Sequence, residues 1–405
     1  MPESMKGLKS RETTENASVV SKARWVLITG EYPPAPGGVS DYSRLVARGL
    51  AAAGDEVHVW APAASQSLPV PSDPGVAVHR LPGKFRRRDL EILDASLNRL
   101  VKPYRLLVQY VPHAFGCKGM NLPFCWWLSR RPEPVWVMFH EVVFPLSLRQ
   151  SLSHNLLGVV TRLMASLVAR KAERIFVSIP AWESYVPRVA RNRVTWLPVP
   201  SNIATSVSTE AVAAIRKQIV PKSDFLVGHF GTYGSHVASL LTRILPALLL
   251  KDSRRKALLL GKGGDGFAAA MMKDNVALRG RIESTGPLSH DQLAAHLAAC
   301  DCLLQPYPDG VSSRRGSLMA GLALGLPIVT NAGPLTDPVW RKTEAVAIAS
   351  PSPLDFIAAV ERLLAEPHWM LDLRRRAVAA YQEYFALART IETLRTGMSD
   401  QRAAA

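Results

Sequence analysis

The chain has 405 residues, of which 48% are hydrophobic and 20% charged, and its formal net charge is +16. This length favours two folded domains over one, and the composition is typical of a globular protein, which excludes extensive disorder. No apolar run is expected to reach the roughly 20 residues that a membrane-spanning helix needs. The positive charge suits an anionic membrane surface, a lipid diphosphate or nucleic acid, and ordinary solvated surface charge accounts for it equally well.

The beginning of the chain and its cysteines bear on its location. Residues 1–23 are polar and contain no apolar stretch of the kind found in secretory signals, which predicts a tail outside the folded domains. Cys300 and Cys302 are expected to share one face of a strand, and the spacing of the four cysteines is typical neither of a zinc site nor of a disulfide framework. Buried thiols in a reducing compartment are the favoured interpretation, so the predicted location is the cytoplasm, including the inner face of the membrane.

Residues 24–202 alternate between short apolar runs and helical patterns and are predicted to form one domain. The first run, residues 25–30, precedes a Pro- and Gly-rich loop and a helix at residues 39–53, and the next strand is expected at residues 56–62. This βαβ unit implies a parallel sheet whose loops gather at the carboxyl ends of its strands. The later elements expected in this half are strands at 105–111, 135–140 and 174–179, a long helix at about 153–171, and a closing strand within 194–203.

A second series of strands and helices follows a weakly periodic stretch. Residues 203–222 are predicted to be a linker that holds one helix, residues 223–368 a second α/β domain, and residues 369–398 a continuous helical segment. Two α/β halves of similar size are therefore predicted. The strands expected in the second half lie within residues 225–234, 256–266, 276–282, 300–308 and 326–331.

Four stretches, in order along the chain, resemble a known family: residues 30–62, residues 258–263 (LLLGKG), residues 286–310, and residues 317–330 (SLMAGLALGLPIVT). Together they are similar to the retaining glycosyltransferase family 4, and the resemblance extends over most of the chain. It implies an α/β protein with the GT-B fold, in which two Rossmann-like domains with parallel sheets face each other across a cleft. It also implies that a nucleotide-sugar donor binds mainly to the second domain and the acceptor mainly to the first.

In the first domain, four residues are assigned to the substrates, three of them by the resemblance and His113 by its position just beyond a strand. Gly37 and Gly38 follow the first strand, where the lack of a Cβ atom lets a diphosphate approach backbone N–H groups at the start of a helix. The alternative is an ordinary turn that needs positive φ. His140 ends a strand and is assigned to the catalytic site, close to the donor sugar, with a satisfied polar group as the alternative. His113 is expected on the acceptor side.

In the second domain, Gly231 and Thr232 follow a strand at a place where the family has a phosphate-contacting loop. Lys262 is the nearest basic candidate for the donor diphosphate. Residues 261–266 also match G-x-G-x-x-G, the consensus sequence of a dinucleotide-binding motif. No well-placed acidic residue follows about 20 residues later, so a nicotinamide or flavin enzyme is the disfavoured alternative.

The resemblance is incomplete at one motif. Family members carry two glutamates around the start of the helix that precedes the last apolar strand, and the alignment places Ser312 and Ala320 at those positions. In the family, the first glutamate contacts the donor sugar and the second holds the nucleotide ribose. Their absence leaves open a catalytically silent relative that binds a sugar nucleotide or a protein partner.

Ser312, Ser313, Arg314 and Arg315 stand where that helix is expected to begin. Serines favour helix N-caps, whereas each arginine opposes the helix dipole at a cost of about 0.3–1 kcal/mol. An anionic ligand opposite the arginines offsets this cost, because Arg binds phosphate through two hydrogen bonds. All four residues are therefore assigned to the donor. The alternative is that one arginine pairs with Asp309, which is itself a candidate for a sugar contact, and that the other is solvated.

The resemblance implies transfer with retention, in which the departing phosphate accepts the proton of the acceptor, and neither a metal site nor a cofactor is expected. The predicted acceptor is a glycan or a lipid-linked molecule of polysaccharide biosynthesis. Trp126, Trp127, Arg130 and Arg131 suit a helix at an anionic membrane surface, and a core helix with a basic end explains them nearly as well. Nucleic acid is not expected as a partner, because the basic residues are scattered.

Overall fold

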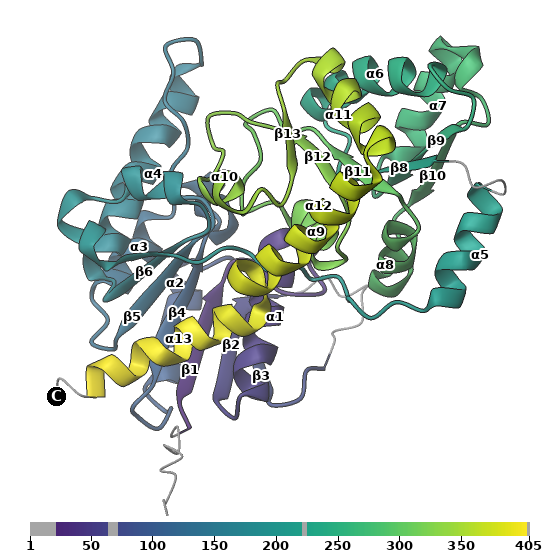
Figure 1. Cartoon of the computed structure of the whole chain (residues 1–405). Helices are drawn as coiled ribbons and strands as arrows, with labels where there is room; N and C mark the ends of the chain where they lie inside the picture. The colour runs from purple at the N-terminus through teal and green to yellow at the C-terminus, as the bar shows by residue number, and fades with distance from the viewer. Residues whose placement is uncertain (1–21, 64–71, 221–224, 403–405) are drawn as a thin grey trace, which may run out of the picture.

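The computed structural model describes residues 22–63, 72–220 and 225–402, with side chains as far as residue 396. All but the last two residues of the predicted tail lie outside this part of the chain. The described residues form two α/β domains, and the C-terminal helix runs back across the first of them (Figure 1). Each domain is built on one parallel sheet, which confirms the predicted pair of Rossmann-like domains.

Seven parallel strands form the N-terminal sheet, in the order β3-β2-β1-β4-β5-β6-β7. Successive side chains of the first strand point to opposite faces, so Val26 and Ile28 enter one core and Trp25 and Leu27 enter the other. Burial on both faces explains why this strand is a continuous apolar run. The elements are β1 (Arg24–Thr29), α1 (Gly38–Ala52), β2 (Glu56–Pro62), β3 (Val76–Leu81), α2 (Arg87–Leu97), β4 (Arg105–Tyr110), α3 (Leu122–Ser129), β5 (Val135–Phe139), α4 (Leu152–Lys171), β6 (Arg174–Val177) and β7 (Val194–Trp196).

Six parallel strands form the C-terminal sheet, in the order β10-β9-β8-β11-β12-β13, and helices cover both of its faces (Figure 1). The elements are α5 (Thr209–Ile219), β8 (Phe225–Phe230), α6 (Ser235–Leu250), β9 (Arg255–Leu260), α7 (Gly264–Asp274), β10 (Ile282–Gly286), α8 (His290–Ala298), β11 (Cys302–Gln305), α9 (Gly316–Ala323), β12 (Ile328–Asn331), α10 (Val339–Thr343), β13 (Ala347–Ala349), α11 (Pro353–Ala365), α12 (Pro367–Ala380) and α13 (Leu387–Arg402). The predicted linker thus holds α5, which packs on α8.

The last helix returns to the N-terminal domain and packs along α1 (Figure 1). Ile391 and Leu394 enter the core beside β1, and Arg395 Nε lies 3.2 Å from Asp55 Oδ2. The helical segment predicted as continuous is interrupted by a π-helical turn at Tyr381–Phe385 and by extended backbone at Ala386. Two separate connections therefore join the domains.

Four predictions about the cysteines and the elements are wrong. Cys302 lies in β11, but Cys300 belongs to the turn before it, because its N–H bonds to the Leu297 carbonyl, and Cys117 is exposed instead of buried. The strand expected within residues 276–282 begins only at its last residue, Ile282. Among the described residues, α4 alone is long and apolar enough to cross a membrane by length and composition, although such a run was not expected. The basic residues Arg162, Arg170 and Lys171 interrupt the apolar sequence of this helix.

The third helix does not present the predicted membrane surface. Trp127 donates a hydrogen bond of 2.8 Å to Asp94, and Arg131 pairs with the same carboxylate. Trp126 remains exposed, with the Arg130 guanidinium 4.0 Å from its ring centroid. The alternative, a helix packed on the domain with basic residues at its end, describes α3 better.

Candidate active site

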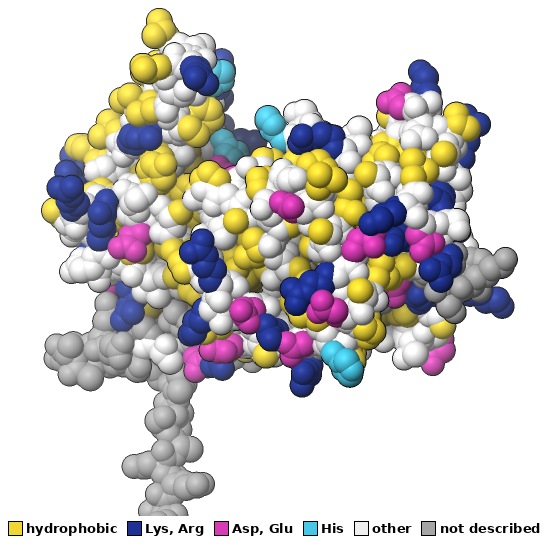
Figure 2. Space-filling view, turned by 45° about the horizontal axis from the view of Figure 1, so that its top comes forward, with side chains coloured by type: hydrophobic (Ala, Val, Ile, Leu, Met, Phe, Trp, Pro, Cys, Tyr) yellow, Lys and Arg dark blue, Asp and Glu magenta, His cyan; other side chains and the backbone are white. Residues whose placement is uncertain are grey.

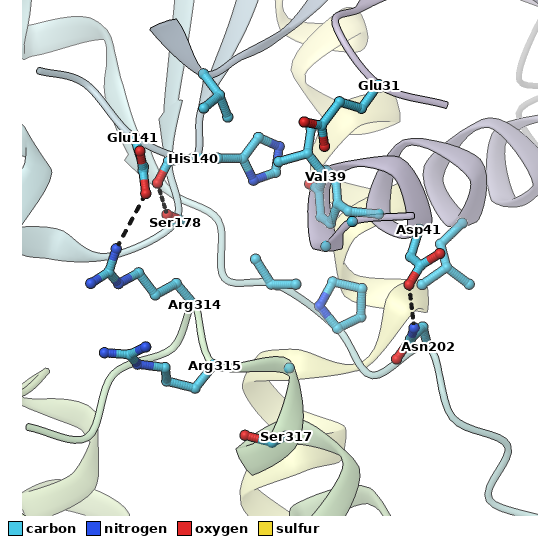
Figure 3. A pocket seen from close by; sticks show the side chains of 18 of the residues that line it. Glu31, Val39, Asp41, His140, Glu141, Ser178, Asn202, Arg314, Arg315 and Ser317 are labelled. Atoms are coloured by element: carbon cyan, nitrogen blue, oxygen red, sulfur yellow. Dashed lines mark hydrogen bonds and ion pairs between the residues drawn. The ribbon is translucent and has the colours of Figure 1, made fainter. Parts of the chain in front are cut away.

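A cleft of about 570 Å³ lies between the two sheets and is lined by residues of both domains (Figure 3). It opens at the carboxyl ends of the parallel strands, where an open α/β sheet binds its ligands. Two of the lining elements are the beginnings of α1 and α9. The lining residues that the argument uses are Glu31, Gly37, Gly38, Asp41, His113, His140, Glu141, Arg314, Arg315 and Gly316.

Glycines occupy the first position of both helices that begin at the cleft. Gly37 has φ +154°, and a Cβ atom there would lie 2.6 Å from the Glu31 carboxylate. Gly38 and Gly316 open α1 and α9, and a Cβ atom on either would meet nothing within 4 Å. Neither helix has a side-chain cap, so its first N–H groups are available to an anion in the cleft. The structure places Gly37 and Gly38 in the cleft, while their contact with the donor stays a prediction.

Arg314 and Arg315 lie side by side in the loop before α9, and both reach the cleft (Figure 3). Both guanidinium groups bond to the carboxylate of Asp309, Arg314 at 2.5 Å. The alternative in which only one arginine pairs is therefore wrong. The guanidinium groups lie 5.3 Å and 4.8 Å from the ring centroids of Trp182 and Tyr307, respectively. The Asp309 carboxylate balances one of the two positive charges, and Glu141 Oε1 lies 3.9 Å from Arg314 Nη1.

Ser312 and Ser313 do not cap α9, whose N-cap is Arg315. Both serines are fully buried. The Ser313 hydroxyl donates to the Ser178 carbonyl at 2.8 Å and accepts from Trp196 Nε1 at 3.1 Å, so it joins the two domains. The prediction that a serine caps α9 is wrong, because the helix begins two residues later than expected and has Arg315 at its N-cap. The arginines therefore sit at the helix start and the serines lie beneath them.

His140 follows β5, and one edge of its ring lines the cleft (Figure 3). Its Nε2 lies 2.9 Å from Gln109 Oε1, and its ring packs edge-on against Tyr42. Burial lowers the pKa of His140 to about 3, so the ring is neutral at physiological pH. A neutral imidazole can hydrogen-bond a sugar hydroxyl, but it is not an imidazolium that could act as a general acid at pH 7. The catalytic assignment of His140 stays a prediction, and the geometry favours positioning over proton transfer.

We expect folding stability to depend on His140 between pH 6.5 and pH 3. An unfolded histidine binds a proton below about pH 6.5, whereas the folded ring does not until about pH 3, so protonation favours the unfolded chain as the pH falls. Each such group lowers the free energy of unfolding by about 1.4 kcal/mol per pH unit in this window. Urea unfolding at pH 7, 6 and 5 should show that the free energy of unfolding falls less steeply with decreasing pH in His140→Gln than in the wild type. His113→Gln, at an exposed histidine, is the control. If the free energies of unfolding of His140→Gln and the wild type differ by the same amount at all three pH values, the lowered pKa of His140 is contradicted.

Glu141 stands where the cleft meets a second cavity. Its carboxylate lies 3.9 Å from Arg314 Nη1 and 3.7 Å from His113 Nδ1. The second cavity measures about 400 Å³ and shares these three residues with the cleft. Its remaining wall is mostly apolar or aromatic and includes Phe144, Pro145, Leu157, Trp182 and Tyr185. His113 thus lines both spaces, in agreement with its predicted position, while its role toward the acceptor is untested.

Besides the buried Ser312 and Ser313, and Asp309, which lines only the second cavity, three more residues predicted to bind the donor do not line the cleft. Gly231, Thr232 and Lys262 follow the ends of β8 and β9. Phe230, the last residue of β8, is the cleft-lining residue nearest to them along the chain. A Cβ atom on Gly261 would lie 2.4 Å from the Gly231 carbonyl oxygen, so this glycine lets the two loops touch. Close packing of these two loops therefore explains the first glycine of the G-x-G-x-x-G match. Contact of these three residues with a donor stays a prediction.

Two further acidic residues of the cleft were not singled out from the sequence. Glu31 lies two residues beyond β1, and Asp41 belongs to the first turn of α1. Asp41 accepts a 2.8 Å hydrogen bond from Asn202, and burial raises the pKa of its carboxyl. Glu141 likewise lies two residues beyond a strand. Position just after a parallel strand was the signal that could have identified Glu31 and Glu141. Among the described residues, no three His, Cys, Asp or Glu side chains gather in a way that suits a metal ion.

Two sequence families match the chain over the ranges that contain this site. Residues 37–202 match the glycosyl transferase 4-like domain, and residues 224–366 match the glycosyl transferases group 1 domain. The chain is a GT-B glycosyltransferase of the family 4 type. The predicted family, fold and enzyme class are confirmed.

Solved structures share the fold of this glycosyltransferase at low sequence identity. Sucrose-phosphate synthase from Thermosynechococcus elongatus has a TM-score of 0.69 and 17% identity, covering 95% of this chain and 100% of that one. HepE from Anabaena, in complex with UDP, has a TM-score of 0.65 and 15% identity, covering 93% and 99%. WaaG, a glycosyltransferase involved in lipopolysaccharide biosynthesis, has a TM-score of 0.64 and 13% identity, covering 92% and 98%. No curated protein sequence matches the chain.

Proposed function

We propose that the glycosyltransferase moves a sugar from a nucleotide-sugar donor to a glycan or lipid-linked acceptor, with retention of the anomeric configuration. The observation that carries the proposal is the convergence of Arg314, Arg315 and two uncapped helix N-termini on one cleft between the domains. Each of these features favours an anion, and a diphosphate is the anion that a nucleotide sugar brings. Positive charge at the leaving diphosphate also lowers the barrier to its departure.

A uridine diphosphate sugar is the first candidate donor. The Anabaena neighbour HepE binds UDP and UDP-glucose, and its fold covers nearly the whole chain. The two positions that carry glutamates in the family, Ser312 and Ala320, are buried and bear no carboxylate. The carboxylates that line the cleft, those of Glu31, Asp41 and Glu141, are proposed to contact the sugar or the ribose in their place.

The relation of the two cavities supports retention. The second cavity joins the cleft at Glu141 and Arg314, beside the arginine pair that is proposed to hold the leaving phosphate. An acceptor hydroxyl that enters there approaches the sugar from the side of the leaving group. In this step the bond between the anomeric carbon and the phosphate oxygen breaks, the acceptor oxygen forms the new bond, and its proton passes to the departing phosphate. No side chain has to act as a strong base, which agrees with the neutral state of His140.

Calorimetric titration with uridine, adenosine, guanosine and thymidine diphosphate sugars tests the proposal. We expect saturable binding of one nucleotide sugar, followed by a glycosylated product whose anomeric configuration, read by proton NMR, matches that of the donor. A folded protein that binds none of these donors would overturn the donor assignment. A product of opposite configuration would overturn retention alone.

A further inference from the structure

The fourth helix turns a row of large apolar side chains toward solvent. Leu152, Leu156, Val159 and Leu163 are spaced by four, three and four residues, which places them in one stripe along the helix. Leu152 is 88% exposed, and each of the others is more than half exposed. The residues of α4 that pack on the domain, such as Thr161 and Val168, lie on the opposite side. The stripe is therefore not part of a core.

The loop before the helix extends this surface. Leu146 is nearly half exposed, and Leu148 is 104% exposed, which means that it has no apolar neighbour covering it. Figure 1 shows α4 projecting from the N-terminal domain, and Figure 2 shows hydrophobic side chains gathered over the same projecting lobe. Single exposed leucines are ordinary on protein surfaces, whereas a contiguous row marks an interaction site.

Basic side chains accompany the leucines, and acidic ones do not. Residues 142–172 contain no Asp or Glu, but they contain four basic residues. Arg149 precedes the stripe, Arg162 lies within the helix, and Arg170 and Lys171 form its last turn. A segment with an exposed apolar row, whose own charged residues are all basic, fits the headgroup region of an anionic bilayer. A second protein chain would need acidic groups opposite these cations, and the nearby part of this chain offers none for a symmetric pair.

The inner side of the same segment forms the wall of the second cavity. Phe144 and Pro145 in the loop, and Leu157 and Thr161 on α4, line that cavity. The exposed stripe and the cavity thus lie on two sides of one helix. An amphiphilic molecule whose tail stays in a bilayer could place its head in the cavity without crossing the protein.

We propose that residues 146–163, with Arg170 and Lys171, dock the enzyme on an anionic lipid bilayer and so present the second cavity to a lipid-linked acceptor. The stripe then lies in the plane of the interface. It does not span the bilayer, because one third of the apolar stretch of α4 is buried against the domain and remains there. The choice of a lipid-linked acceptor rests on the proposed function, whereas bilayer binding itself requires no catalytic activity.

The test is co-sedimentation of the full chain with vesicles of phosphatidylcholine alone or with 30% phosphatidylglycerol. We expect at least tenfold stronger binding to the anionic vesicles, weakened by 0.5 M salt. The triple variant Leu148→Gln/Leu152→Gln/Leu156→Gln should lose at least tenfold in this binding. The matched control, Val276→Gln/Leu354→Gln/Leu371→Gln, replaces three apolar residues elsewhere that are also more than half exposed, and it should bind like the wild type.

The proposal would be overturned if the wild-type protein does not bind anionic vesicles. It would also be overturned if the stripe variant binds them as well as the control variant does. Sedimentation velocity adds a further outcome: a dimer that the stripe variant abolishes, without vesicle binding by the wild type, would assign the surface to a second copy of the chain. Calorimetric donor binding is expected to be the same in both triple variants, since none of the six residues lines the cleft. Failure of donor binding in the wild type would therefore count against the proposed function and not against docking.

Discussion

Replacing Arg314 and Arg315 together by alanine is expected to weaken donor binding by roughly 10²–10⁴-fold, because each charge-assisted hydrogen bond contributes about 1.5–3 kcal/mol. Both side chains line the cleft, and the Arg314 guanidinium is turned toward Glu141. The protein should still fold, since each side chain remains partly exposed and neither lies in a hydrophobic core. Isothermal titration calorimetry with the donor found in the panel measures the loss.

The variant also frees the Asp309 carboxylate, which would then repel the diphosphate. The triple variant with Asp309→Asn separates these effects, because it removes both the arginines and the charge that they neutralise. We expect it to bind the donor as weakly as the double variant, to within about tenfold. Arg243→Ala, which removes an exposed arginine on α6, should leave binding unchanged. If the triple variant instead recovers wild-type affinity, the arginines serve to mask Asp309 and do not bind phosphate.

Much of the fold was readable from the sequence because parallel strands leave a strong local pattern. A strand such as β5 is buried on both faces and appears as an uninterrupted apolar run, and the loop after it enters the cleft wherever the sheet is parallel. That rule placed His140 and the two glycines at the start of α1 at the site. The same rule, applied to every strand, also points to Glu31 and Glu141.

The parts that escaped prediction depend on contacts between distant residues. Ser313 is separated from Ser178 by 135 positions, and no local pattern shows that its hydroxyl is used to join the domains. The stripe on α4 has the spacing of a buried helix face, so periodicity alone cannot tell a covered face from an uncovered one. Likewise, the shared use of Asp309 by two arginines follows from the turn before α9, whose position the sequence predicted two residues too early.

Gly38→Ala is expected to weaken donor binding by roughly tenfold or more, while the free energy of unfolding stays the same or rises slightly. The added Cβ atom meets no protein atom within 4 Å, so the folded chain accommodates it. It would, however, occupy the space in front of the first N–H groups of α1, where the diphosphate is proposed to sit. Gly316→Ala makes the same change at the start of α9 and should act in the same way. Calorimetry and thermal unfolding, measured on the same samples, report the two quantities.

Two other glycines provide the contrast that makes this result interpretable. Gly266 lies inside α7, also has free space around its Cβ position, and is outside the cleft, so Gly266→Ala should leave donor binding unchanged and raise the free energy of unfolding by about 0.5–1 kcal/mol. Gly37→Ala should lower stability as well as binding, because Gly37 has φ +154° and its Cβ atom would meet Glu31. A Gly38→Ala variant that binds the donor like Gly266→Ala would show that the diphosphate does not approach α1. The arginine pair would then hold the diphosphate on the side of α9, and the helix at Gly38 would face the acceptor or the sugar.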